Sequence, residues 1–207
     1  MVIALVVTLG GGKGSSSGAT TIHRDVAAQI LSGPQGPEGI PLEQRTLLAP
    51  TPTGSTGDTI DGIGCDPSEQ AVYHVHTHLA VYVDGVLRPI APGIGIVQPE
   101  ASQSTAGPFY GASTCYYWLH VHAQDGVIHI ESPTVQSYTL GQFFDLWDQP
   151  LAASRVGTAG GTVTVFVDGQ LHRGDPRAIR LGSQEDIQID VGTVVPPMRV
   201  DWSRSQL

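Results

Sequence analysis

The chain has 207 residues, of which 40% are hydrophobic and 14% are charged, so it is long enough for one globular domain with some residues left over. Ten basic residues against nineteen acidic ones give a formal net charge of −9, which has the wrong sign for a surface that binds phosphate groups. We therefore expect no nucleic-acid partner. The unusual surplus is histidine, because six of the eight histidines lie between residues 74 and 129.

Residues 1–60 are expected to precede the main domain. Residues 1–9 are apolar but too few to span a membrane, which takes about 20 residues. We interpret them as the end of an export or anchor helix, with a buried strand or a strand that pairs with a neighbouring copy as alternatives. The sequence of residues 24–33 predicts a short helix. The following stretch, rich in Gly, Pro, Ser and Thr, predicts a linker or a strap over the domain.

Two cysteines, Cys65 and Cys115, are too few for a disulfide scaffold and do not form a CxxC motif. We expect one disulfide between them, with two buried thiols as the alternative. Such a bridge closes a loop of about 50 residues and forms only in an oxidising compartment. It therefore favours an extracytoplasmic location.

Residues 72–83 alternate between polar and apolar side chains, which is the pattern of a half-buried strand. The apolar side chains occupy odd positions, and His74, His76 and His78 occupy even ones. Because side chains alternate across a strand, the three imidazoles must share one face. The Asp84-Gly85 dipeptide then predicts a two-residue turn.

A second hairpin is predicted around Asp125-Gly126, with strands over residues 115–124 and 127–131. In the register that a two-residue turn imposes, His122 faces His129 and His120 faces Glu131. The opposite face is then apolar, whereas a slip by one residue would bury the histidines and expose isoleucines. Four side chains that can bind a metal therefore form one patch.

Histidines at alternating positions of neighbouring strands suit zinc or copper, because neutral imidazoles bind these ions at about 2.0–2.1 Å. The predicted metal ligands are His74, His76, His78, His120, His122 and His129. Glu131 is expected to be a ligand or to support one, and to act as the base if the protein is an enzyme. The alternatives are a hydrogen-bonded surface of His and Tyr, and a cluster that titrates near pH 6.5.

Beyond residue 132 the sequence predicts one main helix and two strands. Thr139 and Gln142 form a capping-box pattern, and aromatic residues at helical spacing predict a buried face after them. Residues 162–167 and 186–191 predict strands. The expected fold is α+β with mainly antiparallel hairpins, and its C-terminal half has the ββαββ order of a β-grasp unit. The domain is expected to cover residues 61–195, with a tail over 196–207.

Three stretches of the chain, HVHTHLAVYVDG, CYYWLHVHAQDGVIHIESP and TLGQFFDLW, resemble a group of uncharacterised exported or membrane-anchored prokaryotic His-rich proteins. The resemblance spans roughly residues 65–150. It implies an extracytoplasmic domain but no reaction.

The expected function is the binding of a copper or zinc ion by histidines on adjacent strands, in a protein that is secreted, on the cell surface or membrane-anchored. One alternative is a metal-dependent enzyme of hydrolase, lyase or oxidase type, in which the ion activates water. Another is a structural subunit of a homo-oligomeric surface assembly, joined through its N-terminal strand. A membrane is expected as a partner only through the N-terminal segment.

Overall fold

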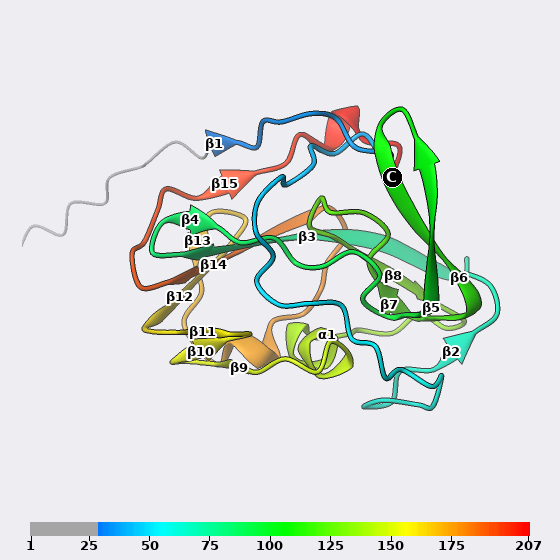
Figure 1. Ribbon diagram of the computed structural model, residues 1–207. Coiled ribbons are helices and arrows are strands. Elements are labelled where there is room, and N and C mark those ends of the chain that lie inside the picture. Colours follow the sequence, from blue (N-terminus) through cyan, green and yellow to red (C-terminus); the bar gives the residue numbers. More distant parts are fainter. Residues whose placement is uncertain (1–28) are drawn as a thin grey trace, which may run out of the picture.

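The structure is a computed structural model that describes residues 29–207 (Figure 1). It is mostly β, with one α-helix among the described residues. In chain order, the elements are β1 (Gln29–Ile30), β2 (Cys65–Asp66), β3 (Tyr73–Val83), β4 (Val86–Leu87), β5 (Ile96–Ser104), β6 (Gly107–Tyr117), β7 (Leu119–His120), β8 (Val127–Ser132), α1 (Leu140–Leu146), β9 (Leu151–Ala152), β10 (Arg155–Val156), β11 (Ala159–Gly160), β12 (Val163–Val167), β13 (Gln170–Leu171), the 3-10 helix η1 (Pro176–Ala178), β14 (Glu185–Val191), β15 (Met198–Arg199) and the 3-10 helix η2 (Trp202–Arg204).

The main sheet has seven strands, in the order β13-β12-β14-β3-β8-β7, with β4 paired to β3. Its neighbouring strands are antiparallel except for β3 and β14, which run parallel to each other near the middle. The predicted mainly antiparallel pairing is therefore confirmed, in a fold that is α+β or β-rich. The helix predicted after Thr139 is present, and so are the four strands predicted at residues 72–83, 127–131, 162–167 and 186–191.

The two faces of the main sheet differ because side chains alternate along its strands. Leu79 and Val81 of β3 point into the main core together with Ile187 and Ile189 of β14. The helix α1 packs on this apolar face (Figure 1). The even-numbered residues of β3 point the other way, onto what we call the polar face, and all three of its histidines are among them.

Helix α1 begins with the predicted capping box. The backbone N–H of Gln142 donates to Thr139 Oγ1 at 3.3 Å, and the backbone N–H of Thr139 donates to Gln142 Oε1 at 2.9 Å. The aromatic residues that follow, Phe143, Phe144 and Trp147, are fully buried in the core. Within residues 29–207, no helix is long and apolar enough to cross a membrane.

The turn after β3 also matches its prediction. Asp84 and Gly85 have φ angles of 49° and 80°, which are the positive values that a two-residue type I′ turn requires at both positions. The register confirms the turn, because Val83 pairs directly with Val86 across it.

The predicted register of the second hairpin is wrong by two residues. His120 faces His129 rather than Glu131, because residues 115–124 do not form one strand. β6 ends at Tyr117 and β7 has only two residues. After β7, the backbone of Val121 bonds to Ile94 and Gly93, and the carbonyl of His122 accepts from Tyr110. A shift by two keeps every histidine on the predicted face.

A long hairpin of β5 and β6, which was not predicted from the sequence, projects from the main sheet (Figure 1). β2 pairs with β6 so that Cys65 faces Tyr117. The predicted disulfide is present, with an S–S distance of 2.03 Å between Cys65 and Cys115.

The prediction of a helix over residues 24–33 is wrong for residues 29–33, which the structure describes and which are not helical. Gln29–Ile30 form strand β1, which pairs in parallel with β15. Tertiary pairing outweighs local helix propensity here, because the N–H groups of Gln29 and Leu31 donate to carbonyls of the C-terminal segment. The tail is therefore folded against the domain. The predictions for residues 1–9 and 24–28 lie outside the described residues.

Residues 31–60, called the strap below, are folded onto the domain. Ile40 and Leu48 of the strap are buried, and residues 38–43 contact the polar face of the sheet. The strap then passes to the side of α1, where the Trp147 indole N–H donates to the Pro50 carbonyl at 2.8 Å. Because residues 38–43 of the strap lie on the polar face, the carboxylates of Glu38 and Glu43 reach histidines of the sheet.

We expect Asp190→Asn to stabilise the protein near neutral pH. Burial raises the pKa of Asp190 to about 6, although hydrogen bonds from Gln188 and the backbone of Val195 oppose this. The native state therefore holds this proton more tightly than the unfolded chain, where an Asp titrates near 3.9. Stability is gained as the pH falls from about 6 to about 4, and asparagine imitates the protonated state at any pH.

Urea unfolding at several pH values tests this expectation. The variant should exceed the wild type by about 1–2 kcal/mol at pH 7.5, and the difference should vanish near pH 4. A variant that is less stable than the wild type at pH 7.5 would contradict the expectation.

Candidate metal centre

Five imidazoles and one carboxylate meet on the polar face, where β8 lies between β3 and β7. His129 of β8 faces His76 on one side and His120 on the other. Glu131 faces His74. The His/Glu cluster consists of His74, His76, His120, His122, His129 and Glu131.

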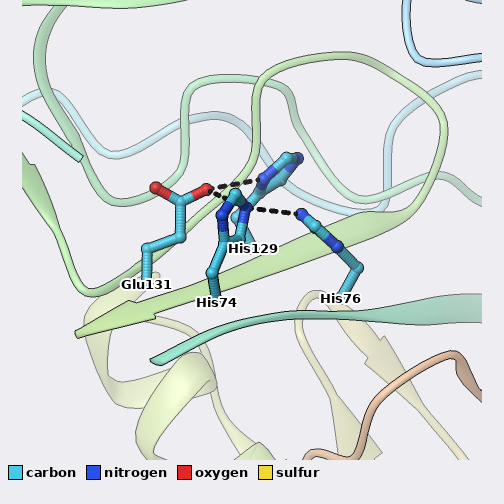
Figure 2. Close-up of side chains that lie close together, drawn as sticks. All are labelled: His74, His76, His129 and Glu131. Carbon is cyan, nitrogen blue, oxygen red and sulfur yellow. Dashed lines mark hydrogen bonds and ion pairs between the residues drawn. The ribbon is translucent and has the colours of Figure 1, made fainter. Parts of the chain in front are cut away.

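The cluster contains two groups of four residues whose candidate ligand atoms all lie within 4.8 Å of one another. The first group is His74, His76, His129 and Glu131, which are drawn in Figure 2. The second group is His120, His122, His129 and Glu131. His129 and Glu131 belong to both groups, so they form the middle of the cluster.

His120 and His122 are oriented by backbone carbonyls. His120 Nδ1 lies 2.8 Å from the Tyr117 carbonyl oxygen, and His122 Nδ1 lies 2.6 Å from that of Tyr110. A carbonyl oxygen can only accept, so each Nδ1 carries the proton. When the ring is neutral, its Nε2 then carries the lone pair, and this is the tautomer that outer contacts impose on metal-binding histidines.

The two Nε2 atoms of this pair are 3.0 Å apart. Two nitrogens that bind one tetrahedral ion at about 2.0–2.1 Å lie about 3.3 Å from each other. The side chains therefore already stand at nearly the separation that a shared ion requires. A proton between the two nitrogens is the other way to satisfy them.

The pair on β3 has the same spacing. His74 Nε2 lies 3.0 Å from His76 Nε2, and it also lies 3.0 Å from Glu131 Oε1 (Figure 2). The same carboxylate oxygen is 3.0 Å from His129 Nδ1 and 3.9 Å from His120 Nε2. Glu131 Oε1 is thus close to a histidine of each pair.

Burial controls the charges of the cluster. Burial, together with neighbouring imidazoles, lowers the pKa of His76 to about 4 and holds the pKa values of His120 and His129 well below the ordinary value. Burial raises the pKa of Glu131 to about 8. For His122, burial is outweighed by the hydrogen bonds to the Glu69 side chain and the Tyr110 carbonyl, so the pKa is raised. Most of these rings are therefore neutral at pH 7, as metal ligands must be.

The cluster is open to solvent at one end. The side chain of His74 is 45% exposed, and so is that of Glu69. The side chains of His120, His122 and Glu131 are at most 2% exposed. An ion can therefore approach from the side of His74.

The structure does not bring His78 together with the other predicted ligands. It lies on the same face, opposite Val127, and its Nε2 is 3.2 Å from Glu43 Oε1. This carboxylate raises the pKa of His78 despite complete burial of the imidazole. The Nε2 of His78 is therefore engaged by a carboxylate, whereas its buried Nδ1 has no hydrogen-bond partner among the described residues.

Three carboxylates near the histidines were not singled out from the sequence. Glu38 Oε1 lies 2.8 Å from His129 Nε2, and Glu69 Oε1 lies 3.3 Å from His122 Nε2. Glu43 is the partner of His78. Glu38 and Glu43 belong to the strap and Glu69 to the segment before β3, where no local periodicity marks which face of the domain they reach.

Comparison of the chain with protein-family models, with curated proteins and with solved structures found no match.

Proposed function

We propose that this protein binds a transition-metal ion, copper or zinc, with His120, His122, His129 and Glu131. The observation that carries the proposal is the orientation of His120 and His122. Their Nδ1 atoms are engaged by backbone carbonyls and their Nε2 atoms converge to 3.0 Å. Buried imidazoles whose Nδ1 atoms are held by the backbone and whose Nε2 atoms converge have the ligand geometry of Zn and Cu sites.

The donor set restricts the class of ion. Imidazole nitrogen suits zinc and copper, whereas calcium and magnesium prefer sites made of oxygen. Glu131 supports a cation at this place, since its Oε1 lies 3.0 Å from both His74 Nε2 and His129 Nδ1. The order of affinities for imidazole sites favours Cu(II) over Zn(II).

We also propose an extracytoplasmic location, secreted or attached to the cell surface. The disulfide between Cys65 and Cys115 supports it, because disulfides persist mainly in oxidising compartments. A disulfide-bonded domain with a histidine site of this kind suits the binding or delivery of an ion outside the cytoplasm.

For the fold, we infer a β-grasp-like unit made of β3, β8, α1, β12 and β14. The spatial order β8-β3-β14-β12 supports this inference. Its two middle strands, β3 and β14, are the first and last of the four along the chain, and they run parallel to each other. The first strand of the unit is then β3 and not residues 115–124. The segment from β4 to β7 is an insertion that brings His120 and His122 to the site.

Metal analysis of the full chain, purified without an affinity tag, tests the function. After removal of metal with a chelator, the protein is titrated with Zn²⁺ and with Cu²⁺ by calorimetry. We expect tight binding of either ion, and unchanged binding by His172→Ala, which removes a histidine far from the cluster. A chain that takes up neither ion would refute the proposal.

The strap carboxylate Glu38 is expected to tune this site. Its Oε1 lies 2.8 Å from His129 Nε2, and a carboxylate beside a metal-binding imidazole makes the ring a stronger ligand. Glu38→Gln should weaken Zn²⁺ binding by about 10–100-fold, as measured by competition with a chromophoric chelator. Glu100→Gln, on the exposed surface of β5, is the matched control. Equal affinities of the two variants would contradict this expectation.

A further inference from the structure

The His/Glu cluster offers more donors than one ion uses. It contains five imidazoles and one carboxylate, and a zinc or copper site of the kind proposed above takes about four ligands. Two donor atoms on opposite sides of one ion are at most about 4.2 Å apart, since each bond is about 2.0–2.1 Å long. Among the described residues, the two histidine pairs do not occur together in one group with ligand atoms within 4.8 Å. One ion therefore cannot contact all six side chains in this arrangement.

The two histidine pairs flank His129, and one ring of each pair has the same geometry relative to it. In each pair the Nε2 atoms are 3.0 Å apart. The ring of His76 lies 4.5 Å from that of His129, with 85° between the ring planes, and the ring of His122 has the same distance and angle. The other two rings differ, because the ring of His74 lies 6.5 Å from that of His129 and the ring of His120 lies 5.2 Å from it, so the pairs flank His129 without exact symmetry.

Glu131 connects the pairs. Its Oε1 lies 3.0 Å from His74 Nε2 in one pair and 3.9 Å from His120 Nε2 in the other. Its second oxygen, Oε2, is buried and has no hydrogen-bond partner within residues 29–207. The first oxygen, Oε1, is thus near both pairs, and a carboxylate has enough lone pairs to bind more than one cation, so Glu131 stands where a bridging ligand is needed.

We propose that the cluster holds two transition-metal ions, one on His74 and His76 and the other on His120 and His122, with the Glu131 carboxylate bridging them. The inference rests on the proposed function and specifies the number of ions. His129 completes the ligand set of one ion. Bridged ions of this kind stand about 3.5–4 Å apart, which is the separation found in two-metal sites.

Stoichiometry tests the inference on the full, untagged chain. Metal-free protein is loaded with excess Zn²⁺, freed of unbound metal and analysed for zinc per chain. The wild type and His172→Ala should each hold two ions. The double variants His74→Ala/His76→Ala and His120→Ala/His122→Ala should each hold one, and Glu131→Gln should weaken the binding of the second ion by at least tenfold.

The zinc content of the wild-type chain distinguishes failure of this inference from failure of the proposed function. One zinc per wild-type chain overturns the two-ion site but leaves the proposed function intact. A wild-type chain without zinc or copper overturns both. Circular dichroism establishes that each double variant is folded before its metal content is compared.

A second measurement needs no variant. Two Cu(II) ions about 4 Å apart couple magnetically, so the copper-loaded wild type should show a half-field signal in electron paramagnetic resonance. Its integrated intensity should also be well below the amount of bound copper. Full intensity and the spectrum of isolated Cu(II) would overturn the bridged pair.

Discussion

Replacement of His129 by alanine is expected to reduce the affinity for Zn²⁺ or Cu²⁺ by at least about 100-fold. His129 is the one imidazole that belongs to both groups of candidate ligands, and its ring lies between those of His76 and His122. Structural zinc sites with four ligands bind with about 10–16 kcal/mol, so one ligand contributes several kcal/mol. Calorimetry and chelator competition measure the loss.

His74→Ala provides the comparison within the cluster. His74 belongs to one group only and is half exposed, so its loss should weaken binding less than the loss of His129. Thermal unfolding of both metal-free variants checks that the fold persists. If His74→Ala proves as damaging as His129→Ala, the central place of His129 in the site is wrong.

Loss of the disulfide is expected to lower the free energy of unfolding by about 4 kcal/mol. Cys65 and Cys115 are 50 residues apart, and closing a loop of that length removes much of the entropy of the unfolded chain. The bridge also holds β2 beside β6, the strand that leads into β7 and His120. Its loss therefore loosens the segment that carries the second histidine pair.

Urea unfolding of the double variant Cys65→Ser/Cys115→Ser measures this effect, with the oxidised wild type as reference. The wild type in a reducing buffer should behave like the variant, which separates the bond itself from the effects of the serine side chains. A loss below about 1 kcal/mol would show that the loop is already restrained in the unfolded chain.

Much of the local structure could be predicted because local chemistry decides it. The alternation in residues 72–83 placed His74, His76 and His78 on one face, as found in β3. The capping box of α1 and the turn at Asp84-Gly85 depend only on neighbouring residues. The disulfide was one of two alternatives, and the structure has it.

The wrong predictions for residues 24–33 and for the register of the second hairpin share a cause, which is pairing between segments that are distant in the sequence. Gln29–Ile30 form a strand because β15 is beside them, and no residue near them in the sequence indicates this. β3 runs parallel to β14 across more than a hundred residues of chain. Local patterns cannot specify such partners, because they come together only as the domain folds.

For the site, the sequence by itself determined which residue types are present and which face of each strand they occupy, since side chains alternate strictly along a strand. Tertiary structure decided which histidines meet. The backbone of residues 121–122 pairs with Gly93, Ile94 and Tyr110, which shifts His120 opposite His129. The strap adds Glu38 beside His129, and His78 is paired with Glu43 instead of joining the cluster. Both outcomes depend on where the strap packs, and only the burial of Ile40 and Leu48 in the folded domain settles that.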